Sequence, residues 1–234
     1  MIDKELNILG RKIVWLFAHP DDECYTAAGT IYENYRNGGE NYLICATAGE
    51  QGASHLPQPR TPGQLRTIRK RELRDACRLL HVNRLYPYDF PDGRVAELIQ
   101  PLYEQSLKTI KKIEPEIIIS FGNDGITGHL DHVAVGQVAR RIARRLRLPF
   151  YAVTLPPRTA QSAHRWLHRR RLSPHYIHTP IKYRTPTLFV SIDRLVKETA
   201  LRCHRSQMDG QNAFIGFPEY AVREVLNYEY FIRG

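Results

Sequence analysis

The chain has 234 residues, of which 42% are hydrophobic and 25% charged, with a formal net charge of +10. This length fits one α/β domain spanning residues 1–234, and the composition excludes disordered and fibrous proteins. The cysteines lie far apart with no C-x-x-C pair, which argues against a disulfide framework or a thiolate zinc knuckle and favours a reducing cytoplasm. No apolar stretch approaches the roughly 20 residues of a membrane helix, so we expect a soluble protein without a membrane span.

Short apolar runs alternate with segments of helical period, which is the pattern of βαβ units. Strands are predicted at residues 12–18, 42–47, 84–90, 116–121 and 150–155, with two more at 176–182 and 187–191. Helices are predicted at residues 26–37, 64–80, 95–113, 132–146 and 194–207. A long loop over residues 48–63 follows the second strand, and loops of this length are usually functional. The sequence therefore predicts a Rossmann-like α/β fold, with a mostly parallel sheet and helices on both faces.

Positive charge is concentrated in one basic segment, residues 132–192. This segment has no acidic residue and holds twelve of the 34 Lys and Arg residues of the chain. The other 22 are offset by the 24 acidic residues, so the basic character of the chain belongs to this segment. Such a segment attracts anions, which indicates an acidic group on the substrate, a subunit interface in a homo-oligomer, or nucleic acid. Nucleic acid is the least favoured partner because no recognisable nucleic-acid motif accompanies the segment.

Two motifs follow the ends of predicted strands, where ligands bind in open α/β sheets. The first is AHPDDE at residues 18–23, and the second is GHLDH at residues 128–132. His19 and Asp22 are three residues apart at a turn, and His132 comes from the other strand end. Two histidines and one carboxylate, with a ligand position left open, are typical of a catalytic site for zinc or another divalent transition metal. Each motif alone is also compatible with a simple helix start, in which Asp21 or Asp22 caps backbone amides.

Asp21 and His129 lie beside the predicted ligands without being ligands themselves. They are therefore a candidate base and a candidate acid beside the metal. Asp131 is two residues from His129 and is predicted to orient that imidazole. Glu23 is expected to be a carboxylate at the helix N-terminus or a partner of a ligand histidine.

These residues resemble the LmbE-like, or PIG-L-type, N-acetylglucosaminyl deacetylases, whose marks are an AHPDDE segment and a later H-x-D-H segment. The R-x-x-E-L helix that includes Arg69, the PDG turn at residues 91–93 and the A-L-x-x-H-x-S-Q segment at residues 200–207 extend the resemblance. Leu130 departs from the proline that many members have.

The resemblance implies a role for each matching residue. His19, Asp22 and His132 would hold zinc, Asp21 would be the general base, and His129 would polarise or protonate. Arg69 and Asp92 would bind sugar hydroxyls, and His204 and Gln207 would line the site. The implied activity is removal of the N-acetyl group from a small N-acetylglucosamine conjugate.

Two alternatives stay open on the sequence. One is a deacylase of a non-sugar amide with the same fold. The other is a basic protein that binds nucleic acid or anions and keeps a structural metal site. This second alternative leaves Asp21 and His129 without a task, and its binding would weaken steeply with salt.

Overall fold

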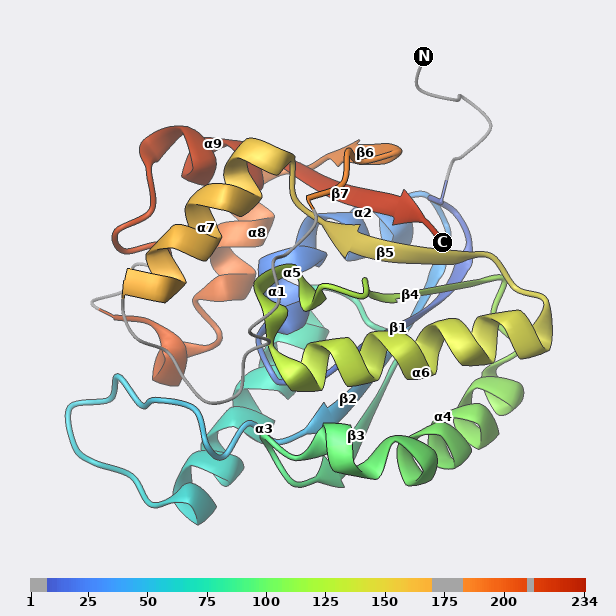
Figure 1. Ribbon diagram of the computed structural model, residues 1–234, viewed down its shortest axis with the longest axis horizontal. Coiled ribbons are helices and arrows are strands. Elements are labelled where there is room, and N and C mark those ends of the chain that lie inside the picture. Colours follow the sequence, from blue (N-terminus) through green and yellow to red (C-terminus); the bar gives the residue numbers. More distant parts are fainter. Residues whose placement is uncertain (1–7, 170–182, 210–212) are drawn as a thin grey trace.

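The computed structural model describes residues 8–169, 183–209 and 213–234, and its centre is a seven-stranded sheet with helices on both faces (Figure 1). The strands are β1 (Lys12–Phe17), β2 (Glu40–Thr47), β3 (Arg84–Phe90), β4 (Ile117–Phe121), β5 (Phe150–Thr154), β6 (Leu188–Ser191) and β7 (Tyr228–Arg233). The order across the sheet is β3-β2-β1-β4-β5-β7-β6. The first five are parallel, whereas β7 pairs antiparallel with both β5 and β6. The predicted Rossmann-like, mostly parallel fold is therefore confirmed.

The helices are joined to the strands as the alternating pattern predicts. They are α1 (Asp22–Thr26), α2 (Ala28–Arg36), α3 (Pro62–Leu79), α4 (Ile99–Ile113), α5 (Gly125–Gly128), α6 (Leu130–Leu146), α7 (Pro157–Arg169), α8 (Arg194–Leu201) and α9 (Glu219–Asn227), with 3₁₀ helices at η1 (Val95–Leu98) and η2 (Arg205–Gln207). The helices α4 and α6 lie side by side, and α6 packs against β1, β4 and β5 (Figure 1). The helix α2 packs against β2, β6, β7 and α8.

The strand order places a switch point between β1 and β4. From β1 the chain moves outward through β2 to β3, then returns to the other side of β1 with β4 and β5. In open α/β sheets, the crevice outside the carboxyl ends of the strands at such a point is where ligands bind. Both strands are buried nearly throughout, which fixes the start of the loops that follow them. The AHPDDE motif begins directly after β1, and the GHLDH motif lies at the junction of α5 and α6, shortly after β4.

Several predicted elements differ from the structure. The helix expected at residues 26–37 is α2, and the short helix α1 before it was not predicted; the two are separated at Ala27, whose backbone leaves the helical region (φ −149°, ψ 3°). The helix expected at residues 95–113 begins as the 3₁₀ helix η1. The helix expected at residues 194–207 stops at Leu201, and the chain then turns so that His204 is buried. The helices α7 and α9 and the strand β7 were not predicted, and the strand expected at residues 176–182 lies outside the described residues.

The predicted long loop is present between β2 and α3. It extends away from the sheet as the cyan trace in Figure 1 and ends where α3 begins at Pro62. Thr61 caps that helix, because its side chain accepts from the backbone N–H of Gln64 while the Gln64 side chain accepts from the N–H of Thr61. None of the helices in the part of the chain that the structure describes has the length and apolarity of a membrane span.

Candidate active site

The turn after β1 is closed by the side chain of Asp22. Its Oδ2 accepts hydrogen bonds from the backbone N–H of Ala18 at 3.1 Å and of His19 at 2.8 Å. Asp21 stands between the two motif residues with φ 107°, in the left-handed region that residues other than glycine rarely adopt. The carboxylate of Asp22 thus fixes the backbone that presents His19, and the strained backbone sits at the predicted general base.

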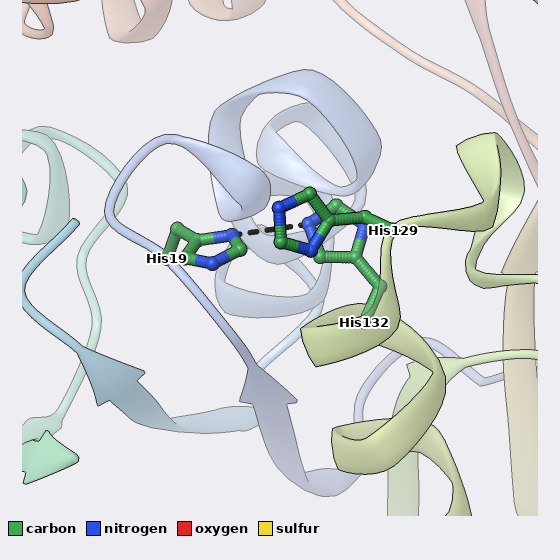
Figure 2. A group of neighbouring side chains, drawn as sticks. All are labelled: His19, His129 and His132. Carbon is green, nitrogen blue, oxygen red and sulfur yellow. Dashed lines mark hydrogen bonds between the residues drawn. The ribbon is translucent and has the colours of Figure 1, made fainter. Parts of the chain in front are cut away.

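The three predicted metal ligands converge at the switch point. The Nδ1 atom of His19 lies 3.1 Å from Nε2 of His132, and Figure 2 shows the two rings meeting beside His129. The Asp22 carboxylate lies 3.2 Å from Nε2 of His132 through Oδ1 and 3.7 Å from Nδ1 of His19 through Oδ2. Two ring nitrogens and a carboxylate at this spacing are a donor set that fits zinc or a neighbouring transition metal.

The second nitrogen of each ligand histidine faces an oxygen. The Nδ1 atom of His132 lies 3.1 Å from the carbonyl oxygen of Gly125, and the ring stacks on Phe121 with centroids 4.0 Å apart. The Nε2 atom of His19 lies 3.0 Å from Asp92 and 3.3 Å from Asp131. In the neutral form of each ring, an N–H donated to these oxygens leaves the inner nitrogen unprotonated, and this neutral form is the one that binds a metal.

The electrostatics of the centre favour positive charge. Burial opposes protonation of His19, but hydrogen bonds to Asp131 and Asp92 outweigh it and raise the pKa to about 10. Burial likewise opposes ionisation of Asp22, but His132 holds the pKa of that carboxyl well below its usual range. The carboxylates therefore create a centre that stabilises a cation.

Asp21 is held by Arg69 rather than by a metal-ligand residue. The Nη2 atom of Arg69 lies 3.0 Å from Oδ2 of Asp21 and also donates to the carbonyl of Pro20, while Nη1 donates to the carbonyl of Gly49 at 2.8 Å. Desolvation raises the pKa of Asp21 to about 6, because the opposing charge of Arg69 offsets it only in part. A carboxyl with this pKa is suited to take a proton near neutral pH.

His129 caps the helix α6 through its side chain. Its Nδ1 accepts a hydrogen bond from the backbone N–H of Asp131 at 3.2 Å, and its ring centroid lies 4.8 Å from that of His19. Burial, followed by the charges of His19 and His132, lowers the pKa of His129 to about 3. Because Nδ1 is an acceptor, Nε2 is the nitrogen that carries the proton.

The carboxylate of Asp131 lies elsewhere than the sequence suggested. It was expected to orient His129, but it accepts from the backbone N–H groups of Gly93 at 2.7 Å and Val95 at 3.0 Å and faces His19. The backbone N–H of Asp131 donates to Nδ1 of His129, while the backbone of the turn at residues 91–93 and of the start of η1 donates to the side chain. Asp131 therefore orients a predicted metal ligand.

The two residues expected to bind sugar are both buried beside the centre. The oxygens of Asp92 face His19 Nε2 and accept from the backbone N–H of Gln51 at 2.9 Å. Arg69, only 3% exposed, is committed to Asp21 and two backbone carbonyls. The structure thus brings both to the site, where they hold His19 and Asp21.

A second buried group lies behind Asp21. Glu23 accepts from the backbone N–H of Asp21 at 3.0 Å and from the thiol of Cys24 at 3.1 Å, and its Oε1 lies 2.6 Å from Nε2 of His204. Its partner is thus His204, not the ligand histidine that was one of the two expectations. The charge of Glu23 raises the pKa of His204 although burial lowers it. This group anchors the strained backbone at Asp21.

The sequence did not reveal the groups that support the site through a backbone carbonyl or through the face of an aromatic ring. The carbonyls of Gly49 and Gly125 and the ring of Phe121 carry no motif of their own. The only signal for them was position, since each closely follows or ends a predicted strand.

Comparison with known proteins identifies close relatives of the chain. The family model for GlcNAc-PI de-N-acetylase, PIG-L, matches residues 14–143. A probable N-acetyl-alpha-D-glucosaminyl L-malate deacetylase 2 of Bacillus anthracis is 30% identical over 84% of this chain and 81% of its own length. The N-acetylglucosaminyl-phosphatidylinositol de-N-acetylase of Bos taurus is 28% identical over 85% of this chain and 76% of its own length.

Solved structures share the fold. The N,N'-diacetylchitobiose deacetylase of Pyrococcus horikoshii aligns with a TM-score of 0.67 and 21% identity, covering 96% of this chain and 84% of that protein. A zinc-inhibited form of a teicoplanin deacetylase aligns with a TM-score of 0.66 and 15% identity, covering 95% of this chain and 98% of that protein.

Proposed function

Because this chain belongs to the PIG-L family of GlcNAc-PI de-N-acetylases, we propose that it is a zinc-dependent hydrolase that removes the N-acetyl group from an N-acetylglucosamine conjugate. The observation that carries this proposal is the convergence of His19, Asp22 and His132, with Asp21 and His129 beside them and outside the ligand set. A structural metal site would have no use for the last two residues.

Zinc would be held by Nδ1 of His19, Nε2 of His132 and the carboxylate of Asp22. The outer nitrogens of both rings already face oxygens, so the donor set fits the ion without a change of tautomer. When bound, such an ion supplies Lewis acidity, which lowers the pKa of water to about 7 and polarises a carbonyl. The zinc-inhibited form of a teicoplanin deacetylase supports the binding of a metal in this fold, and another divalent transition metal is compatible with the same donors.

The residues of the chain account for the proton transfers. Asp21 takes a proton from the attacking water as the water oxygen bonds to the acetyl carbon. The Nε2–H of His129 donates to the former carbonyl oxygen as negative charge develops there. The C–N bond then breaks, the amine nitrogen takes the proton that Asp21 received from water, and acetate and a primary amine leave.

The substrate is proposed to be a small amino-sugar conjugate whose hydroxyls lie on the side of Arg69 and Asp92. Relatives that act on a glucosaminyl malate and on a phosphatidylinositol conjugate support an anionic aglycone. Residues 170–182 of the basic segment lie outside the described residues, so its part in binding that anion stays a prediction. The single domain, the cytoplasmic location and a homo-oligomer likewise stay predictions.

The test is amine release from a panel of N-acetylglucosaminides with neutral, carboxylate and phosphate aglycones. Zinc-loaded protein is expected to release amine from at least one member, fastest from an anionic one, and chelated protein from none. Failure on the whole panel with stoichiometric zinc bound would overturn the proposal. The same zinc-loaded protein then distinguishes the non-sugar amide alternative, because it would hydrolyse simple N-acyl amines instead.

A further inference from the structure

A cavity of about 210 Å³ adjoins the predicted metal centre. It borders the centre through Asp22 and His132 and extends between the ends of β4 and β5, the helices α1 and α9, and residues 213–217. Aromatic and aliphatic side chains form most of the wall, among them Tyr25, Phe121, Leu155, Phe214, Phe217 and Val225. Two of the predicted metal ligands therefore form part of the cavity wall.

The charged residues in the wall neutralise each other. The Nζ atom of Lys197 donates to Oε1 of Glu229 at 2.8 Å, and both side chains are only 1% exposed. Glu229 also accepts from the backbone N–H groups of Gly29 at 3.1 Å and Thr30 at 2.7 Å and from the Thr30 hydroxyl at 2.6 Å. The phenol oxygens of Tyr25 and Tyr230 donate to other groups of the protein. Apart from Asp22 and His132 at the metal centre, the described residues of the wall therefore offer a mainly apolar surface in which the charges are paired.

The polar groups of the site lie outside this cavity. Neither Asp21 nor His129 lines it, and neither do Arg69 and Asp92, which surround the centre from the side of β2 and β3. An amide bound at the centre has two ends, the sugar nitrogen and the acyl carbon. With the sugar hydroxyls on the polar side, the acyl group is directed toward the cavity.

The volume of the cavity exceeds what an acetyl group needs. An apolar cavity of roughly 150 Å³ holds a six-carbon benzene ring, whereas an acetyl group brings one methyl. Resting on the proposed function, we infer that the cavity binds the acyl chain of the substrate and that the enzyme hydrolyses N-acyl groups longer than acetyl, up to about six carbons. In that reaction the water oxygen bonds to the acyl carbon, the C–N bond breaks, and a longer carboxylic acid leaves with the same amine.

The first experiment varies the acyl chain on one glucosamine conjugate. With zinc-loaded protein, kcat/KM is expected to rise about fourfold for each methylene buried from N-acetyl to N-butyryl to N-hexanoyl. It is expected to fall for N-decanoyl, which is too long for the cavity. A second series keeps N-acetyl and lengthens an alkyl aglycone. A preference that follows the aglycone instead of the acyl chain would overturn the inference.

Two variants fill the cavity from the same helix. Ala221→Leu and Val225→Phe enlarge lining side chains of α9, so the ratio of kcat/KM for N-hexanoyl to that for N-acetyl is expected to fall at least tenfold. The matched control is Val222→Leu, also on α9 and next to Ala221 but outside the lining, which should leave the ratio unchanged. An unchanged ratio in folded Val225→Phe protein would contradict the inference.

Binding of the acid products separates this inference from the proposed function. Calorimetric titration of zinc-loaded protein is expected to show hexanoate binding roughly tenfold or more tightly than acetate, with the difference lost in Val225→Phe. Hydrolysis of N-acetyl conjugates with no gain for hexanoyl or hexanoate would overturn the inference and leave the proposed function standing. Tighter hexanoate binding without hydrolysis of any conjugate would overturn the proposed function and support the cavity as an acyl site.

Discussion

The carboxylates around His19 come from three segments of the chain and differ in role. Asp22 faces the inner nitrogens of the histidine pair, whereas Asp92 and Asp131 face the outer nitrogen of His19. Asp21 points to Arg69 and keeps away from the ligand set. The orientation of each carboxylate, more than its presence, decides its chemistry.

Replacing Asp131 by Asn should weaken metal binding. The carboxylate accepts two backbone N–H groups while facing His19, and an amide offers a single oxygen for these three contacts. Zinc affinity, measured by competition with a chromophoric chelator, is expected to fall about tenfold to a hundredfold. The matched control is Asp89→Asn, a surface carboxylate paired with Arg66, which should leave the affinity unchanged. Equal affinity in Asp131→Asn and the native protein would refute this role.

For single residues, the sequence indicated which side chains belong to the site better than it indicated which groups those side chains contact. The ligand triplet could be predicted because its two motifs come shortly after predicted strands, with His19 and Asp22 after β1 and His132 after β4. The partner of Asp131 could not, because the start of α6 turns its side chain toward the backbone at Gly93 and Val95, a contact between distant parts of the chain.

Among the elements, the loop after β2 positions Arg69, the partner of Asp21, through the close approach of its backbone at Gly49. Gly49 has φ +67°, and a Cβ added there would lie 2.2 Å from Nη1 of Arg69. The guanidinium that pairs with Asp21 is thus seated against a position where only glycine leaves room.

The substitution Gly49→Ala should therefore displace Arg69 and reduce turnover. Because a displacement of about 1 Å near the reacting groups can cost a hundredfold, kcat is expected to fall at least tenfold. The matched control is Gly38→Ala, since Gly38 has φ +79° but nothing within 4 Å of an added Cβ. Both variants should lose about 1–2 kcal/mol of unfolding free energy from the strained backbone. If kcat fell equally in both, the loss would be due to instability and not to Arg69.

Helices and strands with a clear pattern of apolar residues were predictable, and those whose ends depend on tertiary contacts were not. The strands β1, β2 and β4 are continuous apolar runs and lie within one or two residues of their predicted bounds. The predicted helix over residues 194–207 is cut short because His204 turns inward to Glu23, and no local pattern shows that contact. The strand β7, which lies between β5 and β6, directly follows α9 with no turn signal between them, and it was missed.

For the whole molecule, the metal centre joins two halves of the sheet. His19 follows β1 and His132 follows β4 across the switch point, with 112 residues between them. A metal that binds both only in the folded chain stabilises that chain by mass action.

Removal of the metal should therefore lower the melting temperature. At zinc concentrations of about 100 times Kd the stabilisation is about 2.7 kcal/mol. For a chain of this size that corresponds to a shift of about 5–10 °C between zinc-loaded and chelated protein. In His132→Ala the shift should largely disappear. An equal shift in that variant would locate the zinc elsewhere.

The parallel part of the sheet was predictable from the sequence, whereas the pairing of the strands at the β6 end of the sheet was not. Alternating strand and helix signals indicated parallel βαβ units, and connection rules then place consecutive strands side by side. The antiparallel pairing of β7 with β5 and β6 could not be foreseen, because it depends on how the chain returns after the basic segment.

The central claim is that Asp21 takes the proton from water at a metal centre of His19, Asp22 and His132. The most direct test is amine release from an N-acetylglucosamine conjugate by zinc-loaded native protein and by Asp21→Asn, with zinc content measured in both. The account predicts equal zinc content and a kcat about a hundredfold to ten-thousandfold lower in the variant. Equal zinc content with kcat within threefold of the native value would contradict it.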